Sequence, residues 1–146
     1  MRIVVIGAGA VGLSAALISE MAGHDVTLVD PTGFDHPTPK GEITTKVWAI
    51  GSKSRSFLSD LGVSFDSDRI CSYSRMRVVD SSSDARVEFC ADHLGDMVEA
   101  NWLCSQLASK VALSSIKCRI DPIRAVSHEG IIDDPVDELT RCDLAV

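Results

Sequence analysis

The first thirty residues of this 146-residue chain constrain its fold more than any other segment. The β-branched run Ile3–Ile6 is typical of a buried parallel strand. The sequence that follows, Gly7-Ala8-Gly9-Ala10-Val11-Gly12, has the G-x-G-x-x-G spacing of a dinucleotide-binding turn. An apolar helix over 13–22, stopped by glycine, and a strand over 26–29 complete a β-α-β unit. We therefore expect a dinucleotide-binding α/β fold.

The three glycines have separate roles in such a turn. Gly7 permits the sharp change of direction after the strand, Gly9 lets a pyrophosphate approach the backbone, and Gly12 lets the helix pack close to the sheet. The backbone N–H groups of Ala10 and Val11, together with the positive end of the helix dipole, form an anion site without a charged side chain.

Asp30 ends the second strand, 18 residues after Gly12. A carboxylate near this position hydrogen-bonds the adenosine ribose in dinucleotide sites. It also argues against NADP, because a 2′-phosphate would meet a like charge. Five separate elements match a dinucleotide-binding unit: the turn, the helix, the two strands and the carboxylate. A chance glycine turn in an ordinary α/β unit is therefore the weaker interpretation.

Composition excludes several classes of function. The net charge of −7 argues against a nucleic-acid binder, and the 45 % hydrophobic content is enough for a core. The apolar run over 3–18 is too short to span a membrane, and its spaced glycines are foreign to a secretory signal. We expect a cytoplasmic protein, with peripheral contact with the inner membrane as an alternative left open.

The five cysteines and four histidines show no metal-ligand spacing, so no metal site is predicted. The cysteines are odd in number and lack a C-x-x-C pair, which indicates reduced, mostly buried thiols. The histidines are expected on the surface or in the core.

Residues 31–45 contain three prolines and two glycines and predict a loop, whose length suggests that it wraps a ligand. Residues 46–50 predict a short extended segment. Ser52 is expected to cap a helix that Gly62 ends and whose Phe57, Leu58 and Leu61 lie on one face.

Two alternating segments, 75–80 and 85–90, predict an antiparallel pair with one solvent-exposed face, joined by a serine turn. Such strands do not belong inside a parallel sheet, so residues 70–92 are expected in a second sheet. The following segment predicts a helix over 98–113 with one apolar side, formed by Trp102, Leu103, Leu107 and Val111. After it we expect strands at 116–120 and 123–126, a turn at 129–130 and a buried strand at 142–146.

Four segments together resemble the flavin-dependent aromatic hydroxylases, and within them the ubiquinone-biosynthesis branch. Residues 3–30 resemble the FAD fingerprint of many flavoproteins. Residues 46–62 resemble the branch's R-x-x-A-L…S-x-x-x-L-x-x-L-G segment, and residues 76–80 resemble its M-x-V-x-D strand. Residues 94–103, the most branch-specific segment, resemble its L-G-x-x-V-E-N-x-x-L helix start.

Two positions depart from the family pattern. Lys46 stands where the family usually has an arginine that reaches the flavin pyrophosphate. Lysine keeps the positive charge but lacks the bidentate fork of arginine, which implies weaker binding of the cofactor. Ala100 stands where the branch usually has asparagine, and Asn101 follows it, so that polar contact is lost or moved by one position. The expected cofactor-binding residues are therefore Gly7, Gly9, Ala10, Val11, Gly12, Asp30, Lys46 and Asn101.

The resemblance implies an α/β fold: a Rossmann-like, glutathione-reductase-type FAD-binding β-α-β domain with an antiparallel excursion into a substrate-domain sheet. Residues 1–69 and 93–146 would form the two parts of the FAD-binding domain, and residues 70–92 strands of the substrate domain. The implied activity is an FAD-dependent monooxygenase that hydroxylates an aromatic ring, a ubiquinone precursor, with NAD(P)H and O₂. Expected partners are a small aromatic or quinone-type substrate, no nucleic acid, and a membrane surface or biosynthetic complex.

Residues 142–146 resemble the strand that, in this family, runs into a Gly-Ala-Asp-Gly segment, followed later by a Gly-Asp motif that binds the ribityl chain. Neither motif is present, so we interpret the chain as an N-terminal fragment with the ADP-binding half of a flavin site and no catalytic residue. Uncovered sheet edges would then favour aggregation of the fragment alone.

Two other functions fit part of the sequence. An NAD-dependent dehydrogenase would share the fingerprint and Asp30, but its strand-helix alternation should continue where residues 70–92 break it. A truncated, non-catalytic FAD-binding module is the other alternative.

Overall fold

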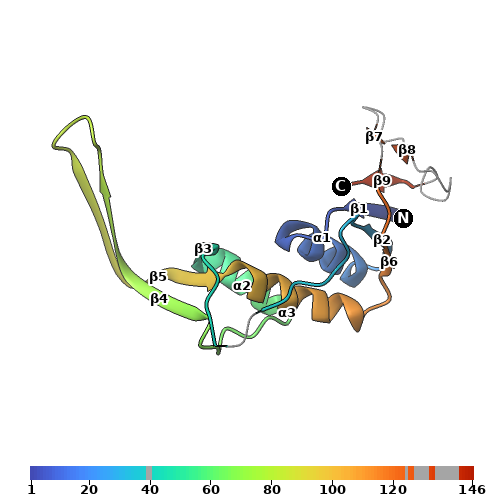
Figure 1. Ribbon diagram of the computed structural model, residues 1–146, viewed down its shortest axis with the longest axis horizontal. Coiled ribbons are helices and arrows are strands. Elements are labelled where there is room, and N and C mark those ends of the chain that lie inside the picture. The colour runs from blue at the N-terminus through green and yellow to red at the C-terminus, as the bar shows by residue number, and fades with distance from the viewer. Residues whose placement is uncertain (39–40, 124, 127–131, 134–141) are drawn as a thin grey trace.

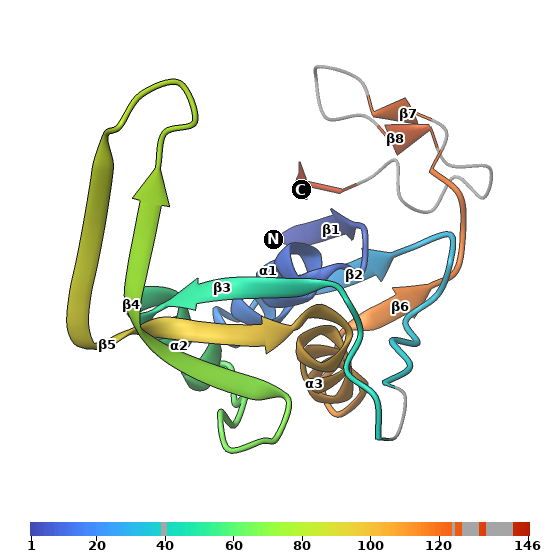
Figure 2. The same cartoon turned by 60° about the vertical axis from the view of Figure 1, so that its left-hand side comes forward.

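The computed structural model describes residues 1–38, 41–123, 125–126, 132–133 and 142–146. Figures 1 and 2 show a parallel sheet and helices on one side of the molecule and a long two-stranded arm projecting from the other. The fold is therefore α/β with a separate antiparallel sheet, as the sequence predicts.

The parallel sheet has the strand order β6-β2-β1-β9, made of β1 (Arg2–Ile6), β2 (Asp25–Val29), β6 (Lys117–Arg119) and β9 (Leu144–Ala145). Doubly wound sheets place their first four parallel strands in this same order, and they bind ligands where the order reverses, at the carboxyl ends of the strands. In this chain the reversal lies between β1 and β9, so the turn that follows β1 stands at the expected ligand position.

The predicted burial of the last strand is wrong. Leu144 is 45 % exposed and Val146 is 56 % exposed. The reason is that β9 pairs with β1 along one edge only and is the outer strand of the described sheet.

Helix α1 (Ala10–Met21) covers one face of the parallel sheet. Val5 and Leu28 point to that face, whereas Val4 and Val29 belong to a small cluster on the other. Such alternation is the consequence of successive strand side chains pointing to opposite faces. The helix ends as predicted, because Gly23 follows it with φ at +83°, a conformation that favours glycine.

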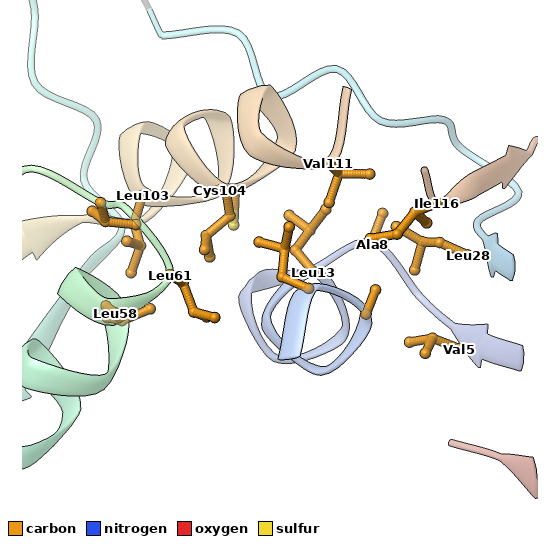
Figure 3. Close-up of a cluster of buried hydrophobic side chains, with 14 of the residues drawn as sticks. Val5, Ala8, Leu13, Leu28, Leu58, Leu61, Leu103, Cys104, Val111 and Ile116 are labelled. Atoms are coloured by element: carbon orange, nitrogen blue, oxygen red, sulfur yellow. The ribbon is translucent and has the colours of Figure 1, made fainter. Parts of the chain in front are cut away.

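Helix α3 (Ala100–Ala112) packs against α1 and forms the centre of the core (Figure 3). All four residues predicted to share its buried face are buried, namely Trp102, Leu103, Leu107 and Val111. The predicted start at Val98 is wrong by two residues. Val98 and Glu99 still pair with Trp48 and Val47 in the antiparallel sheet, so the helix begins only after that ladder ends.

The antiparallel sheet has the order β3-β5-β4, from β3 (Val47–Gly51), β4 (Ile70–Val79) and β5 (Arg86–Glu99). The extended segment predicted at 46–50 is confirmed by β3. Helix α2 (Ser52–Asp60) follows it directly, and its N-cap residue is Gly51 without a side-chain cap bond. Ser52 as the cap is therefore wrong, because Ser52 is already the first helical residue.

The arm is the outer part of the β4–β5 hairpin, and its register confirms the predicted antiparallel pair, from Arg75 opposite Cys90 to Val79 opposite Arg86. One face carries two apolar cross-strand pairs, Met76 with Phe89 and Val78 with Val87. These four side chains are 44–51 % exposed, so both faces of the arm meet solvent instead of one. The proposed domain limits at 69 and 92 stay predictions.

The last described elements are the short strands β7 (Ala125–Val126) and β8 (Ile132–Asp133), which pair with each other. The first agrees with the strand predicted at 123–126, and the turn predicted at 129–130 lies outside the described residues. The loop predicted at 31–45 has no helix or strand in its described part. In the described residues we find no helix with the length and apolar character needed to cross a membrane.

The prediction of mostly buried cysteines is wrong. Cys104 is buried in α3, whereas Cys71, Cys90 and Cys118 are exposed. Two of the exposed thiols lie on the uncovered hairpin, and Cys118 lies on β6, the other outer strand of the parallel sheet.

Candidate cofactor-binding site

The glycine turn joins β1 to α1 at the carboxyl end of the parallel sheet. Gly7 has φ at +102°, which favours glycine. A Cβ on Gly12 would lie only 1.8 Å from the Gly7 carbonyl oxygen. Helix and turn therefore approach more closely than any other residue allows at position 12.

Gly9 differs from Gly12, because nothing lies within 4 Å of the place that a Cβ would occupy. Gly9 is the N-cap of α1, has ordinary extended dihedral angles and is exposed, and Val11 is 84 % exposed. The protein's own packing does not require glycine at position 9. The space in front of Gly9 is free for a ligand to approach the backbone.

A pocket of about 720 Å³ opens at this end of α1. It brings together five of the eight predicted site residues, Gly9, Ala10, Val11, Lys46 and Asn101. Gly7, Gly12 and Asp30 are not among the lining residues, and Asp30 instead bonds the backbone of the turn at Ala8. The remainder of the wall is largely apolar and comes from β3, α2 and α3, including Trp48, Ile50, Phe57, Leu58 and Leu103.

Lys46 precedes β3, and its Nζ lies 5.4 Å from the centre of the Trp48 ring. Its backbone carbonyl accepts a 3.0 Å hydrogen bond from Ala100 N at the start of α3. The described lining of the pocket contains no acidic side chain beside Lys46. The site is therefore suited to an anion.

Asn101 lines the pocket one position after the asparagine of the family pattern, and its contact with a cofactor stays a prediction. Ala100 is only 2 % exposed and forms part of the core. The side chain of Asn101 lines the pocket and donates from Nδ2 to the Pro37 carbonyl at 3.3 Å.

Asp30 turns its carboxylate towards the glycine turn. Oδ2 accepts from Ala8 N at 2.8 Å, and Oδ1 accepts from the N and Oγ1 of Thr32 at 2.7 and 2.6 Å. Burial alone would raise the pKa of Asp30, but these hydrogen bonds and nearby His36 lower it below its ordinary value. Asp30 is consequently a carboxylate at neutral pH, able to accept further hydrogen bonds from a ribose.

His36 is a pocket-lining residue that is not among the predicted site residues. Its Nε2 lies 2.9 Å from the Ala8 carbonyl oxygen. A lone histidine in a proline-rich loop carries no sequence signal, and the half-buried position of His36 is consistent with the expectation that the histidines lie on the surface or in the core.

Cys104 also lines the pocket, from α3. Burial raises the pKa of its thiol, and the Ala10 backbone and Lys46 oppose this only in part. Cys104 is therefore a neutral thiol and contributes an apolar wall.

Two buried carboxylates, also missed, fix the antiparallel sheet beneath the pocket. Asp96 is fully buried and accepts from Arg55 at 2.6 Å, Ser72 at 2.6 Å and His93 at 3.2 Å. Burial alone would raise its pKa, but these donors lower it. The cluster ties α2 to both β4 and β5.

Glu99 is the second buried carboxylate, at the junction of β5 and α3. It accepts from Arg69 at 2.7 Å and from Thr44 N at 3.1 Å. Burial opposes ionisation, and the two donors still lower the pKa of Glu99. The loop before Lys46 is thereby attached to the start of α3.

Several solved structures resemble the chain. 2,6-Dihydroxypyridine-3-hydroxylase from Arthrobacter nicotinovorans is 21 % identical with a TM-score of 0.59, and the match covers 92 % of this chain and 33 % of that one. PqsL from Pseudomonas aeruginosa, a probable FAD-dependent monooxygenase, is 14 % identical with a TM-score of 0.62 over 91 % and 37 %. CmlS, a flavin-dependent halogenase, is 19 % identical with a TM-score of 0.60 over 88 % and 24 %.

These similarities show the fold that the chain shares with flavin-dependent monooxygenases and halogenases. The chain spans a quarter to about a third of the length of those structures. No family model matches the chain, and no curated protein matches its sequence.

Proposed function

We propose that this chain forms the ADP-binding part of an FAD-dependent monooxygenase that hydroxylates an aromatic ring. The observation that carries the proposal is the turn in which Gly12 packs against the Gly7 carbonyl at the ligand end of a parallel sheet. The shared fold of flavin-dependent enzymes supports FAD over other dinucleotides.

The residues present fit the adenosine and diphosphate groups of FAD. Gly9 leaves open space before the backbone at the start of α1, where N–H groups and the helix dipole favour an anion. Lys46 adds a positive charge on the pocket wall, and Asp30 offers carboxylate oxygens for ribose hydroxyls. Asn101 supplies a further polar contact.

When bound, FAD would supply the redox chemistry, taking electrons from NAD(P)H and activating O₂. The role of this chain is to bind and orient: the turn and Lys46 hold the diphosphate, and the apolar wall excludes water. We assign no acid, base or nucleophile for hydroxylation to this chain.

We further propose a ubiquinone precursor, or a related small aromatic or quinone-type compound, as the substrate. The support is the resemblance of residues 94–103 to the ubiquinone-biosynthesis branch. Contact with the inner membrane or with a biosynthetic complex would bring such an apolar substrate to the enzyme, and the acidic chain offers no support for a nucleic-acid partner.

The antiparallel sheet argues against the NAD-dependent dehydrogenase. Between β2 and β6 the chain forms β3, α2, β4, β5 and α3 instead of one crossover helix. A simple dinucleotide domain would alternate strand and helix through this stretch.

Turnover by the full-length gene product tests the proposal. With NADH or NADPH, ¹⁸O₂ and prenylated or unprenylated phenols, we expect cofactor oxidation that depends on the phenol and a product with one labelled oxygen. A halogenated product in the presence of chloride or bromide would contradict hydroxylation, but it would still agree with a flavin cofactor. Failure of NAD(P)H to reduce the protein under any of these conditions would contradict the monooxygenase itself.

A further inference from the structure

Ala8 in the glycine turn is hydrogen-bonded through both its backbone N–H and its backbone carbonyl by side chains from outside the turn. Ala8 N donates to Asp30 Oδ2 at 2.8 Å, and the Ala8 carbonyl oxygen lies 2.9 Å from His36 Nε2. Ala8 itself is only 1 % exposed. The two side chains thus form a clamp on one buried residue.

The chemistry of the partners fixes the direction of the His36 bond. A carbonyl oxygen can only accept a hydrogen bond, so Nε2 must carry the proton and donate it. His36 therefore acts on the turn as an N–H donor at the Nε2 position.

Backbone hydrogen bonds fix the two ends of the turn, from Gly7 N to the Val29 carbonyl at 2.8 Å and from Leu13 N to the Gly9 carbonyl at 2.9 Å, and leave Ala8 between them to the two side chains. Gly7 and Gly9 are conformationally permissive, and a Cβ at either would meet nothing within 4 Å. The N-cap of α1 makes no side-chain hydrogen bond. The backbone that shapes the diphosphate site is accordingly held by groups from elsewhere in the chain.

The loop that carries His36 is itself anchored. Asn101 on α3 donates to the carbonyl of Pro37, the next residue. His36 also lines the same pocket as Gly9 and Ala10. The loop after β2 is therefore bonded both to the glycine turn and to α3.

We propose that His36 is a positioning residue of the diphosphate site. Its Nε2–H holds the Ala8 carbonyl, so that the backbone from Ala8 to the first turn of α1 keeps the shape that accepts the diphosphate. The inference rests on the proposed function, because it concerns the same site.

Two amide substitutions in the full-length gene product separate this role from general stability. His36→Gln places an N–H donor about as far from the backbone as Nε2, whereas His36→Asn is too short to reach Ala8. His24→Asn is the matched control, since His24 lies between α1 and β2, at the other end of the sheet. The probes are ADP, titrated by calorimetry, and amide hydrogen exchange of residues 8–12 without ligand.

We expect His36→Asn to weaken ADP binding about tenfold, equivalent to about 1.4 kcal/mol, and to speed exchange of residues 8–12. His36→Gln should restore most of both properties, and His24→Asn should match the unsubstituted protein. ADP binding unchanged in His36→Asn, or as weak in His36→Gln as in His36→Asn, would overturn the inference. If the unsubstituted protein binds neither ADP nor FAD, the proposed function itself fails, and the exchange data then still show whether the clamp exists.

Discussion

Gly9 and Gly12 are three residues apart, yet the structure predicts opposite consequences for replacing them with alanine. A Cβ at Gly12 would lie 1.8 Å from the Gly7 carbonyl oxygen and 3.0 Å from its carbon. A Cβ at Gly9 would meet no atom within 4 Å, at φ of −75°. Gly12→Ala should therefore destabilise the fold, whereas Gly9→Ala should affect only the approach of a ligand.

The cost of Gly12→Ala follows from the overlap. The obstacle is backbone, which cannot rotate away as a side chain could, so α1 must move off the turn. Overpacking of this kind costs up to about 3 kcal/mol, and the better helix propensity of alanine returns about 1 kcal/mol. We expect the free energy of unfolding to fall by about 2 kcal/mol, and cofactor affinity to fall with it.

For Gly9→Ala we expect the free energy of unfolding to change by less than about 1 kcal/mol, the range for a changed N-cap residue. The dissociation constant for ADP or FAD should nevertheless rise at least about tenfold, or about 1.4 kcal/mol, because the methyl group occupies the space of the diphosphate.

Urea unfolding of both variants beside the unsubstituted protein, followed by ADP titration, makes the comparison. Unchanged stability in Gly12→Ala would refute the close approach of turn and helix. Unchanged ADP affinity in Gly9→Ala would refute the assignment of the turn as the diphosphate site.

Three further perturbations have defined outcomes. Lys46→Ala should raise the dissociation constant for ADP about tenfold and Lys46→Arg should lower it, because arginine offers a bidentate fork to phosphate; equal affinities would contradict a phosphate contact. Asp96→Ala should cost about 2 kcal/mol in urea unfolding, less than the roughly 3–5 kcal/mol for breaking a fully buried pair, because the Arg55 side chain is 36 % exposed. Since the pKa of Asp96 is lowered in the folded state, its contribution is present above the unfolded pKa of about 4 and is lost as pH falls below it; acid sensitivity unchanged in Asp96→Asn would contradict this. Replacing Val78 by lysine and the opposite Val87 by glutamate should leave the unfolding free energy within about 0.5 kcal/mol and reduce self-association in light scattering, since both side chains are half-exposed on the arm and the new charges attract; equal association would show that the apolar side chains of the arm do not mediate self-association.

The elements with local signals could be predicted from the sequence. The turn between β1 and α1 follows from glycine spacing, and the end of α1 follows from Gly23, because left-handed and close-contact positions select glycine. The buried face of α3 follows from its helical periodicity.

The errors arise where tertiary pairing overrides local preference. Val98 and Glu99 continue a helical pattern, but pairing with β3 keeps them in a strand. The thiols of Cys71 and Cys90 look like core residues, yet they lie on a hairpin that no described segment covers.

Long-range polar partners leave no trace in the sequence. Asp96 is bound by side chains 24 and 41 residues earlier in the chain, and His36 meets Ala8 across 28 residues. No spacing rule connects such positions, so the clamp on the turn could not be predicted from the sequence. Five of the predicted site residues do line one pocket, because motif spacing marks them.

The cofactor content of the purified full-length gene product decides whether the glycine turn belongs to a flavin site. We predict FAD, identified by absorbance and by mass after heat release, bound at one molecule per chain and displaced competitively by ADP. Absence of FAD after reconstitution, together with tight binding of NAD, would contradict it.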